Sequence, residues 1–218
     1  EDLSKMCVVY SNRVPNILET YTKEPDGTYK LFAKKVTKAQ GRIYDAYSIA
    51  TDAKLNILVQ SSKGVGIAMT SPADWSEVHI YDISNERINP EDENFLSTSI
   101  VKLDHTGMPI DFNNTISEEQ TVLSGDGNTL FIIQPRVAFT TTGRNVGIIT
   151  IFKKNPTNSQ YEVVHKITGR SAYSELGGAL ECNYDGSIFA FRERVNGKRE
   201  ISVYRFLSNT STSPVLIN

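Results

Sequence analysis

The residues of this chain best suited to acid–base or nucleophilic chemistry are three histidines and two cysteines. They are His79, His105, His165, Cys7 and Cys182. A hydrolase would need a nucleophile beside a base, or two carboxylates that face each other. His79 and His165 fall within predicted strands, His105 lies in a predicted turn, and no Gly-x-Ser-x-Gly motif accompanies them. The sequence therefore predicts no catalytic residues, although carboxylates that converge from separate repeats would favour an enzyme.

The two cysteines predict no metal centre and no cofactor site. Cys7 and Cys182 lie at opposite ends of the chain, and neither belongs to a Cys-x-x-Cys pair of the kind that binds zinc. A disulfide between them would require the two ends of the chain to meet, and the sequence leaves that pairing open.

Two Asp-Gly pairs predict tight turns rather than metal ligation. The pairs are Asp126 with Gly127 and Asp185 with Gly186. Glycine adopts the positive φ that such turns require, and the Asp carboxylate accepts hydrogen bonds from nearby backbone N–H groups. We therefore expect these four residues to form turns.

A turn followed by an apolar strand recurs along the chain. The unit occupies residues 123–133 and 182–191, with a weaker copy at 50–59. A second strand that ends in aromatic residues follows each copy, at residues 147–152, 200–206 and 77–82 respectively. A repeat of several tens of residues that contains only strands and turns is typical of a β-propeller.

One small antiparallel sheet cannot bury both of its faces alone, and stacking such sheets around an axis solves the problem. We therefore expect an all-β, propeller-like single domain made of antiparallel four-stranded blades, with the first blade incomplete. The expected blades occupy about residues 1–41, 42–107, 108–169 and 170–218.

The repeat resembles the FG-GAP type of propeller blade. In residues 176–191, small residues lead into an Asp-Gly turn and an apolar strand, and residues 123–133 resemble the pattern more closely. The second copy has Thr51-Asp52-Ala53 in place of Ser-x-Asp-Gly. The resemblance implies a rigid platform that presents loops to proteins or glycans. The closely spaced acidic residues of calcium-binding blades are absent, so calcium is not expected.

Composition excludes some partners. The 218 residues carry a formal charge of −2, and the sequence lacks the clustered cations that nucleic acid requires. No apolar run reaches the roughly 20 residues of a membrane-spanning helix, and the N-terminus has no signal-peptide pattern. Because the chain starts at Glu1, we expect a processed product or a fragment, and its localisation cannot be read.

Long loops suggest where a protein or glycan partner would bind. Aromatic and arginine side chains on loops are good anchors for partners. The candidate contact residues are Met69, Trp75, Arg136, Phe139 and Arg144. The sequence therefore favours a non-enzymatic scaffold for protein–protein or surface recognition, and it does not identify the partner.

Two other functions stay open. The first is a structural subunit of a large assembly, such as a virion or cell-surface complex, in which a strand of another chain completes a blade, because the chain is short for a closed ring. The second is a propeller hydrolase or lyase. Asn113 and Asn209 begin glycosylation sequons in predicted loops, which keeps a secreted protein among the alternatives.

Overall fold

The computed structural model describes residues 4–10, 16–37, 44–64, 76–82, 99–102, 120–134, 146–171, 173–174, 176–208 and 211–217. These residues form fifteen strands, and no helix occurs among them. The all-β prediction is therefore confirmed.

The strands form four antiparallel sheets that follow one another along the chain. The first sheet contains β1 (Lys5–Tyr10), β2 (Asn16–Lys23) and β3 (Tyr29–Thr37). The second contains β4 (Tyr44–Thr51), β5 (Ile57–Gly64), β6 (Ser76–Asp82) and β7 (Ser99–Lys102). The third contains β8 (Gln120–Leu123), β9 (Thr129–Gln134), β10 (Ile148–Lys154) and β11 (Tyr161–Thr168). The fourth contains β12 (Leu180–Cys182), β13 (Ile188–Val195), β14 (Lys198–Phe206) and β15 (Pro214–Leu216).

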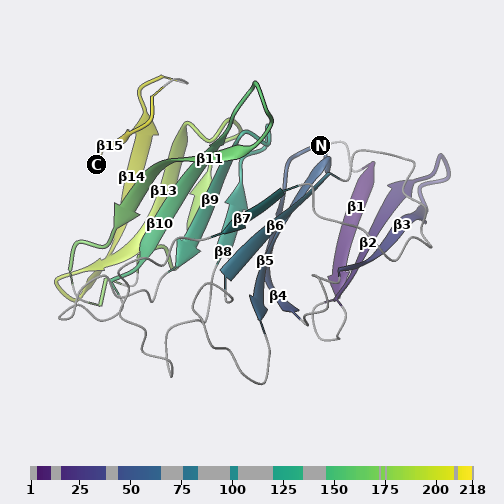
Figure 1. Cartoon of the computed structure of the whole chain (residues 1–218), viewed down its shortest axis with the longest axis horizontal. Coiled ribbons are helices and arrows are strands. Elements are labelled where there is room, and N and C mark those ends of the chain that lie inside the picture. The colour runs from purple at the N-terminus through teal and green to yellow at the C-terminus, as the bar shows by residue number, and fades with distance from the viewer. Residues whose placement is uncertain are drawn as a thin grey trace.

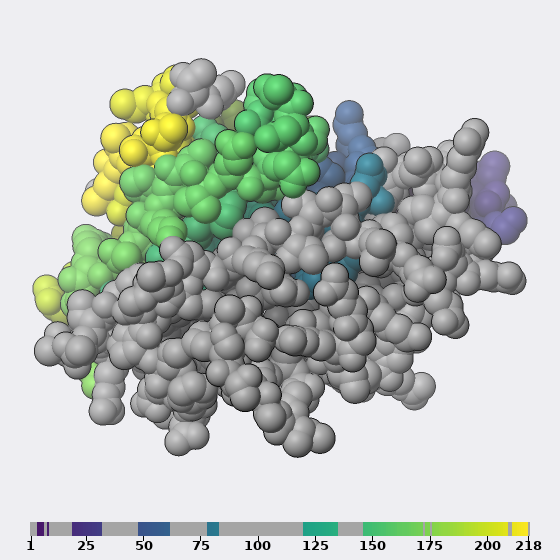
Figure 2. All heavy atoms as spheres, in the orientation of Figure 1, coloured from purple at the N-terminus to yellow at the C-terminus, as the bar shows by residue number. Residues whose placement is uncertain are grey.

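The sheets stand side by side, as in part of a propeller. Figure 1 shows them in chain order, from the first sheet at the right to the fourth at the left. The first strands of the second, third and fourth sheets lie close together, and β8 contacts both β4 and β12. The row of sheets does not close into a ring, and the space-filling view places the C-terminal strands, in yellow, at one end of the molecule (Figure 2). The first sheet has three strands where the other three have four, as expected.

Strand β9 of the third sheet is buried on both faces, and this is the central packing feature of the fold. All six residues of β9 are buried. Because side chains alternate along a strand, Leu130 and Ile132 join one apolar core and Phe131 and Ile133 join another. The first core includes residues of the second sheet such as Val59, Val78 and Ile80, and the second core includes Phe189 and Phe191 of the fourth sheet. A continuous apolar strand thus connects three sheets.

The equivalent face of the fourth sheet is exposed. In the third sheet Ile149 pairs with Ile133, and in the fourth sheet Ile201 pairs with Arg192 at the corresponding register. Ile149 is 0% exposed and Ile201 is 65% exposed. The sequence has placed an arginine where the third sheet has a buried isoleucine, so this face is not built like the buried interfaces.

Replacing these two isoleucines with alanine tests the arrangement. Ile149→Ala is expected to lower the free energy of unfolding by about 2–5 kcal/mol, because it leaves a cavity between two sheets. The matched change Ile201→Ala is expected to cost less than about 0.5 kcal/mol, because the side chain is largely solvated. Urea unfolding followed by circular dichroism measures both values, and equal losses would contradict the stacking described here.

Candidate functional site

Three turns of the same design join the first two strands of the second, third and fourth sheets. They occupy residues 52–57, 124–129 and 183–188. In each turn the N–H of the first residue donates to the carbonyl of the sixth, at 3.3, 2.9 and 3.0 Å respectively. The N–H of the fourth residue donates to the carbonyl of the first, at 3.1, 2.9 and 3.0 Å. The hydrogen bonds therefore align the three turns residue by residue.

The first residue of each turn also bonds to the turn through its side chain. Asp52 Oδ1 accepts from the N–H of Ile57 at 2.8 Å, Ser124 Oγ from that of Thr129 at 2.9 Å, and Asn183 Oδ1 from that of Ile188 at 2.9 Å. Short polar side chains favour such local bonds to the backbone.

This alignment corrects the sequence comparison of the second copy. Thr51-Asp52-Ala53 does not replace Ser-x-Asp-Gly, because Asp52 itself stands at the position of Ser124. Lys54 then corresponds to Asp126, and Leu55 to Gly127. Leu55 has a φ of 52°, in the region that Gly127 occupies with a φ of 73°. The turn at residues 52–57 therefore has the same geometry with leucine at the position of glycine.

The structure places the four predicted turn residues in these turns. Asp126 Oδ1 accepts from Ser124 Oγ at 2.6 Å and from the N–H of Asn128 at 2.9 Å. Asp185 Oδ1 accepts from the N–H of Ser187 at 2.9 Å. Hydrogen bonds from Ser187 hold the pKa of the Asp185 carboxyl below its usual value.

Neighbouring turns interlock. The N–H of Ala53 donates to Gly125 O at 2.9 Å, and that of Asp126 donates to Tyr184 O at 3.0 Å. A Cβ on Gly127 would lie 2.8 Å from Ile57 Cδ1 in the preceding sheet. A Cβ on Gly186 would likewise lie 2.6 Å from Thr129 Cβ. These two glycines supply both a positive φ and the space that the neighbouring sheet fills.

The interlocked turns form one wall of a groove of about 600 Å³. The lining combines carboxylates, ammonium groups, amides and phenols, and it draws on three sheets. These residues include Asp52, Asp82, Asp126, Lys54, Lys154, Asn56, Gln160, Tyr81, Tyr161 and Tyr184. We call this the first groove.

The tyrosines of the first groove have different environments. Tyr184 is 60% exposed, and its ring lies directly against Gly125, where a Cβ would be 2.5 Å from Tyr184 Cδ2. Tyr161 is buried, and its hydroxyl donates to Gly127 O at 2.5 Å. Burial raises the pKa of both Tyr81 and Tyr161, so both remain neutral phenols at physiological pH. Tyr184 is therefore the aromatic surface that the groove offers to a ligand.

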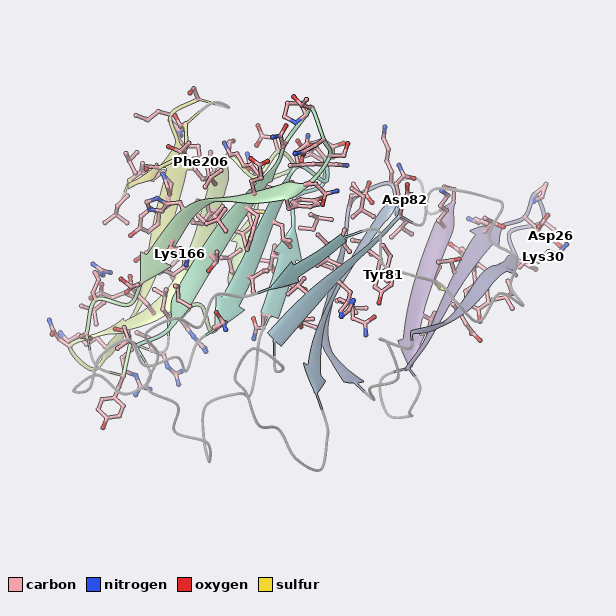
Figure 3. All side chains as sticks on the ribbon, in the orientation of Figure 1. Asp26, Lys30, Tyr81, Asp82, Lys166 and Phe206 are labelled. Carbon is pink, nitrogen blue, oxygen red and sulfur yellow. The ribbon has the colours of Figure 1, made fainter. Side chains whose placement is uncertain are left out.

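A second groove of about 410 Å³ adjoins the first one, between the third and fourth sheets. Its lining includes Asn128, Lys153, Asn155, Asp185, Ser187 and Phe206, and it shares Asp126, Lys154 and Ser159 with the first groove. Lys153 Nζ lies 4.2 Å from the centroid of the Phe206 ring and donates to Ser211 O at 3.1 Å. Burial lowers the pKa of Lys153, and the charge of Asp185 opposes that effect. In Figure 3, Asp82 and Phe206, which line the two grooves, both lie toward the upper edge of the sheets.

The loop residues expected to contact a partner lie outside the described residues, as do the asparagines of both sequons and one histidine. They are Met69, Trp75, Arg136, Phe139, Arg144, Asn113, Asn209 and His105. His79 and His165 lie within β6 and β11 as predicted, and burial lowers the pKa of His165. Cys182 is a free thiol, and burial raises its pKa to about 11, whereas the side chain of Cys7 is not among the described ones.

Metal ligation finds no support within the described ranges. No group of three or more His, Cys, Asp or Glu side chains that could hold a metal ion occurs there. No helix among the same residues is long and apolar enough to cross a membrane.

Neither groove was predicted from the sequence. Asp52, Asp126 and Tyr184 are far apart in the chain, and only the stacking of the sheets brings them together. The available signal was the turn repeat itself, because residues at equivalent turn positions must lie side by side once the sheets stack.

Three solved structures with a similar fold are distant from this chain in sequence. A candidate 6-phosphogluconolactonase of Bacteroides fragilis is 9% identical, with 96% of this chain and 55% of that chain covered and a TM-score of 0.54. The β-propeller domain of Cps50 (Swd1) from Myceliophteria thermophila is 11% identical, with coverages of 99% and 55% and a TM-score of 0.53. A structure from a study of two prolyl endopeptidases is 13% identical, with coverages of 98% and 28% and a TM-score of 0.50. No family model and no curated protein matches the chain.

These likenesses establish a propeller-type fold. This chain spans 55% of the length of the first two structures and 28% of the length of the third. They also correct the expected function. The sequence favoured a non-enzymatic protein–protein or surface-recognition scaffold, but the fold is shared with enzymes, among them a candidate lactonase and prolyl endopeptidases. The Swd1 propeller domain has the same fold, so the proteins that share this fold include enzymes and other propellers.

Substitutions at the fourth position of two aligned turns, Gly127 and Leu55, are expected to change stability by different amounts. Gly127→Ala is expected to destabilise the protein by about 1–2 kcal/mol through its positive φ alone, and contact with Ile57 adds to that cost. Leu55→Gly is expected to change stability by less than about 0.5 kcal/mol, because the lost side-chain contacts offset the relieved backbone strain. Thermal and urea unfolding measure both variants. A neutral Gly127→Ala variant would show that the turns do not interlock.

Proposed function

We propose that this protein binds a neutral, polyhydroxylated ligand of the carbohydrate class in the first groove. The observation that carries the proposal is the exposed ring of Tyr184. This ring lines a groove that also contains carboxylates, ammonium groups and amides. An aromatic side chain with a polar hydroxyl provides apolar contact area and a hydrogen-bonding group in one residue. Sugars present the matching combination of C–H faces and hydroxyl groups.

The charges of the first groove favour a neutral ligand. Three carboxylates, from Asp52, Asp82 and Asp126, stand beside the ammonium groups of Lys54 and Lys154. Such a nearly balanced set does not produce the strong positive field that attracts phosphate or a polyanion. Hydroxyl groups both donate and accept hydrogen bonds, so they can use carboxylate, amide and ammonium groups together.

The interlocked turns favour binding because they fix the groove in advance. Asp52 and Asp126 are held by hydrogen bonds to their own turns, and the turns are held to one another. Side chains that are already ordered lose little entropy when a ligand arrives. A glycan partner, which the sequence suggested beside a protein partner, fits this groove. The FG-GAP-type identity of the repeats belongs to the same proposal and rests on their turns and strands alone.

Isothermal titration calorimetry with a panel of neutral mono- and oligosaccharides tests the proposal. D-gluconolactone belongs in the panel, because a candidate lactonase shares the fold, and its hydrolysis is followed in a pH-stat. Tyr184→Ala is expected to weaken binding by about tenfold, which corresponds to the roughly 1.4 kcal/mol of a good aromatic contact. Turnover of the lactone would add hydrolysis to the binding role.

Tyr173→Ala is the matched control, because Tyr173 is also an exposed tyrosine, at 51%, and does not line the groove. Its affinity is expected to equal that of the unmodified protein. The proposal is wrong if no sugar in the panel binds, or if the two tyrosine variants lose affinity equally.

A further inference from the structure

The two grooves share part of their walls. Asp126, Lys154 and Ser159 line both of them. Asp126 occupies the third position of the turn in the third sheet, the sheet that both grooves border. One groove therefore continues into the other over the turns of the second, third and fourth sheets.

We infer that the ligand is a linear oligosaccharide that crosses both grooves, rather than a single sugar. This inference rests on the proposed function and specifies its ligand. The volumes of about 600 and 410 Å³ each fall within the range of roughly 300–1,000 Å³ that one small ligand occupies. The two together exceed what a single sugar unit would fill.

The repeat also gives the grooves related chemistry. Asp126 contributes a carboxylate to the first groove as Asp185 contributes one to the second, from the third position of successive turns. A surface that repeats its groups at a fixed spacing matches a polymer that repeats its own. A linear glycan is such a polymer.

The charge of the second groove supports the same class of ligand. Its carboxylates, from Asp126 and Asp185, are balanced by the ammonium groups of Lys153 and Lys154. Phe206 is buried there and Lys153 lies over its ring, so this groove offers polar contacts and no open aromatic face. Tyr184 therefore supplies the stacking contact for one sugar unit, and the second groove holds its neighbours through hydroxyl groups.

The test compares the members of one neutral glucose series, from glucose through the disaccharide to the tetrasaccharide, by calorimetry on the complete chain. Affinity is expected to rise at least tenfold from glucose to the tetrasaccharide. Ser187→Trp places a bulky side chain in the second groove only and is expected to abolish this rise while leaving glucose affinity unchanged. Asn155→Trp provides a second block at another residue of the same groove.

Lys198→Trp is the control, because this exposed residue lines neither groove, and it is expected to keep the full rise. Circular dichroism identifies any variant that fails to fold, which the other blocking variant then replaces. Equal affinity for glucose and the tetrasaccharide would overturn this inference and leave the proposed function standing. A rise that survives both folded blocking variants would overturn it too. No binding of any member would contradict the proposed function itself.

Discussion

The interlock between successive turns is the interaction on which the rest of this structure depends. The sixth residue of one turn fills the space beside the fourth residue of the next, as Ile57 does at Gly127 and Thr129 does at Gly186. Backbone hydrogen bonds from Ala53 to Gly125 and from Asp126 to Tyr184 fix the same contact. Because the turns are held in this way, the groups that line the grooves have fixed positions relative to one another. The proposed binding surface is therefore a direct consequence of how the sheets stack.

Stacking also explains the composition of the sheets. The third sheet has a neighbour on each side, and β9 is correspondingly apolar on both faces. On the fourth sheet, Arg192 and the exposed Ile201 stand where the third sheet buries Ile133 and Ile149. The cost of exposing one apolar side chain is small, so the sheet tolerates this face. The difference between a buried and an exposed sheet face is thus visible in the residue types.

Much of the fold could be predicted from the sequence, because turn and strand signals are local. The Asp-Gly turns occur where they were expected, and the apolar run after Gly127 is β9. The turn at residues 52–57 was misaligned in the sequence comparison because Leu55 has the positive φ that usually requires glycine. The sequence of that turn therefore lacks the glycine that marks the other two. The grooves were missed because they are not local. Tyr184 and Asp52 line one groove only after three sheets have stacked, whereas the sequence signals for a recognition scaffold were the long loops and Trp75.

Backbone amide chemical shifts, recorded while a neutral tetrasaccharide is added, show directly whether the stacked turns bind a ligand. We expect the amides of Lys54, Asp126 and Ser187 to shift together along one saturation curve, because these residues line the two connected grooves. We expect no shift at Asp26 and Lys30, which lie on the outer hairpin of the first sheet (Figure 3). Shifts confined to other parts of the chain, or no shifts at saturating sugar, would contradict a ligand-binding role for the stacked turns.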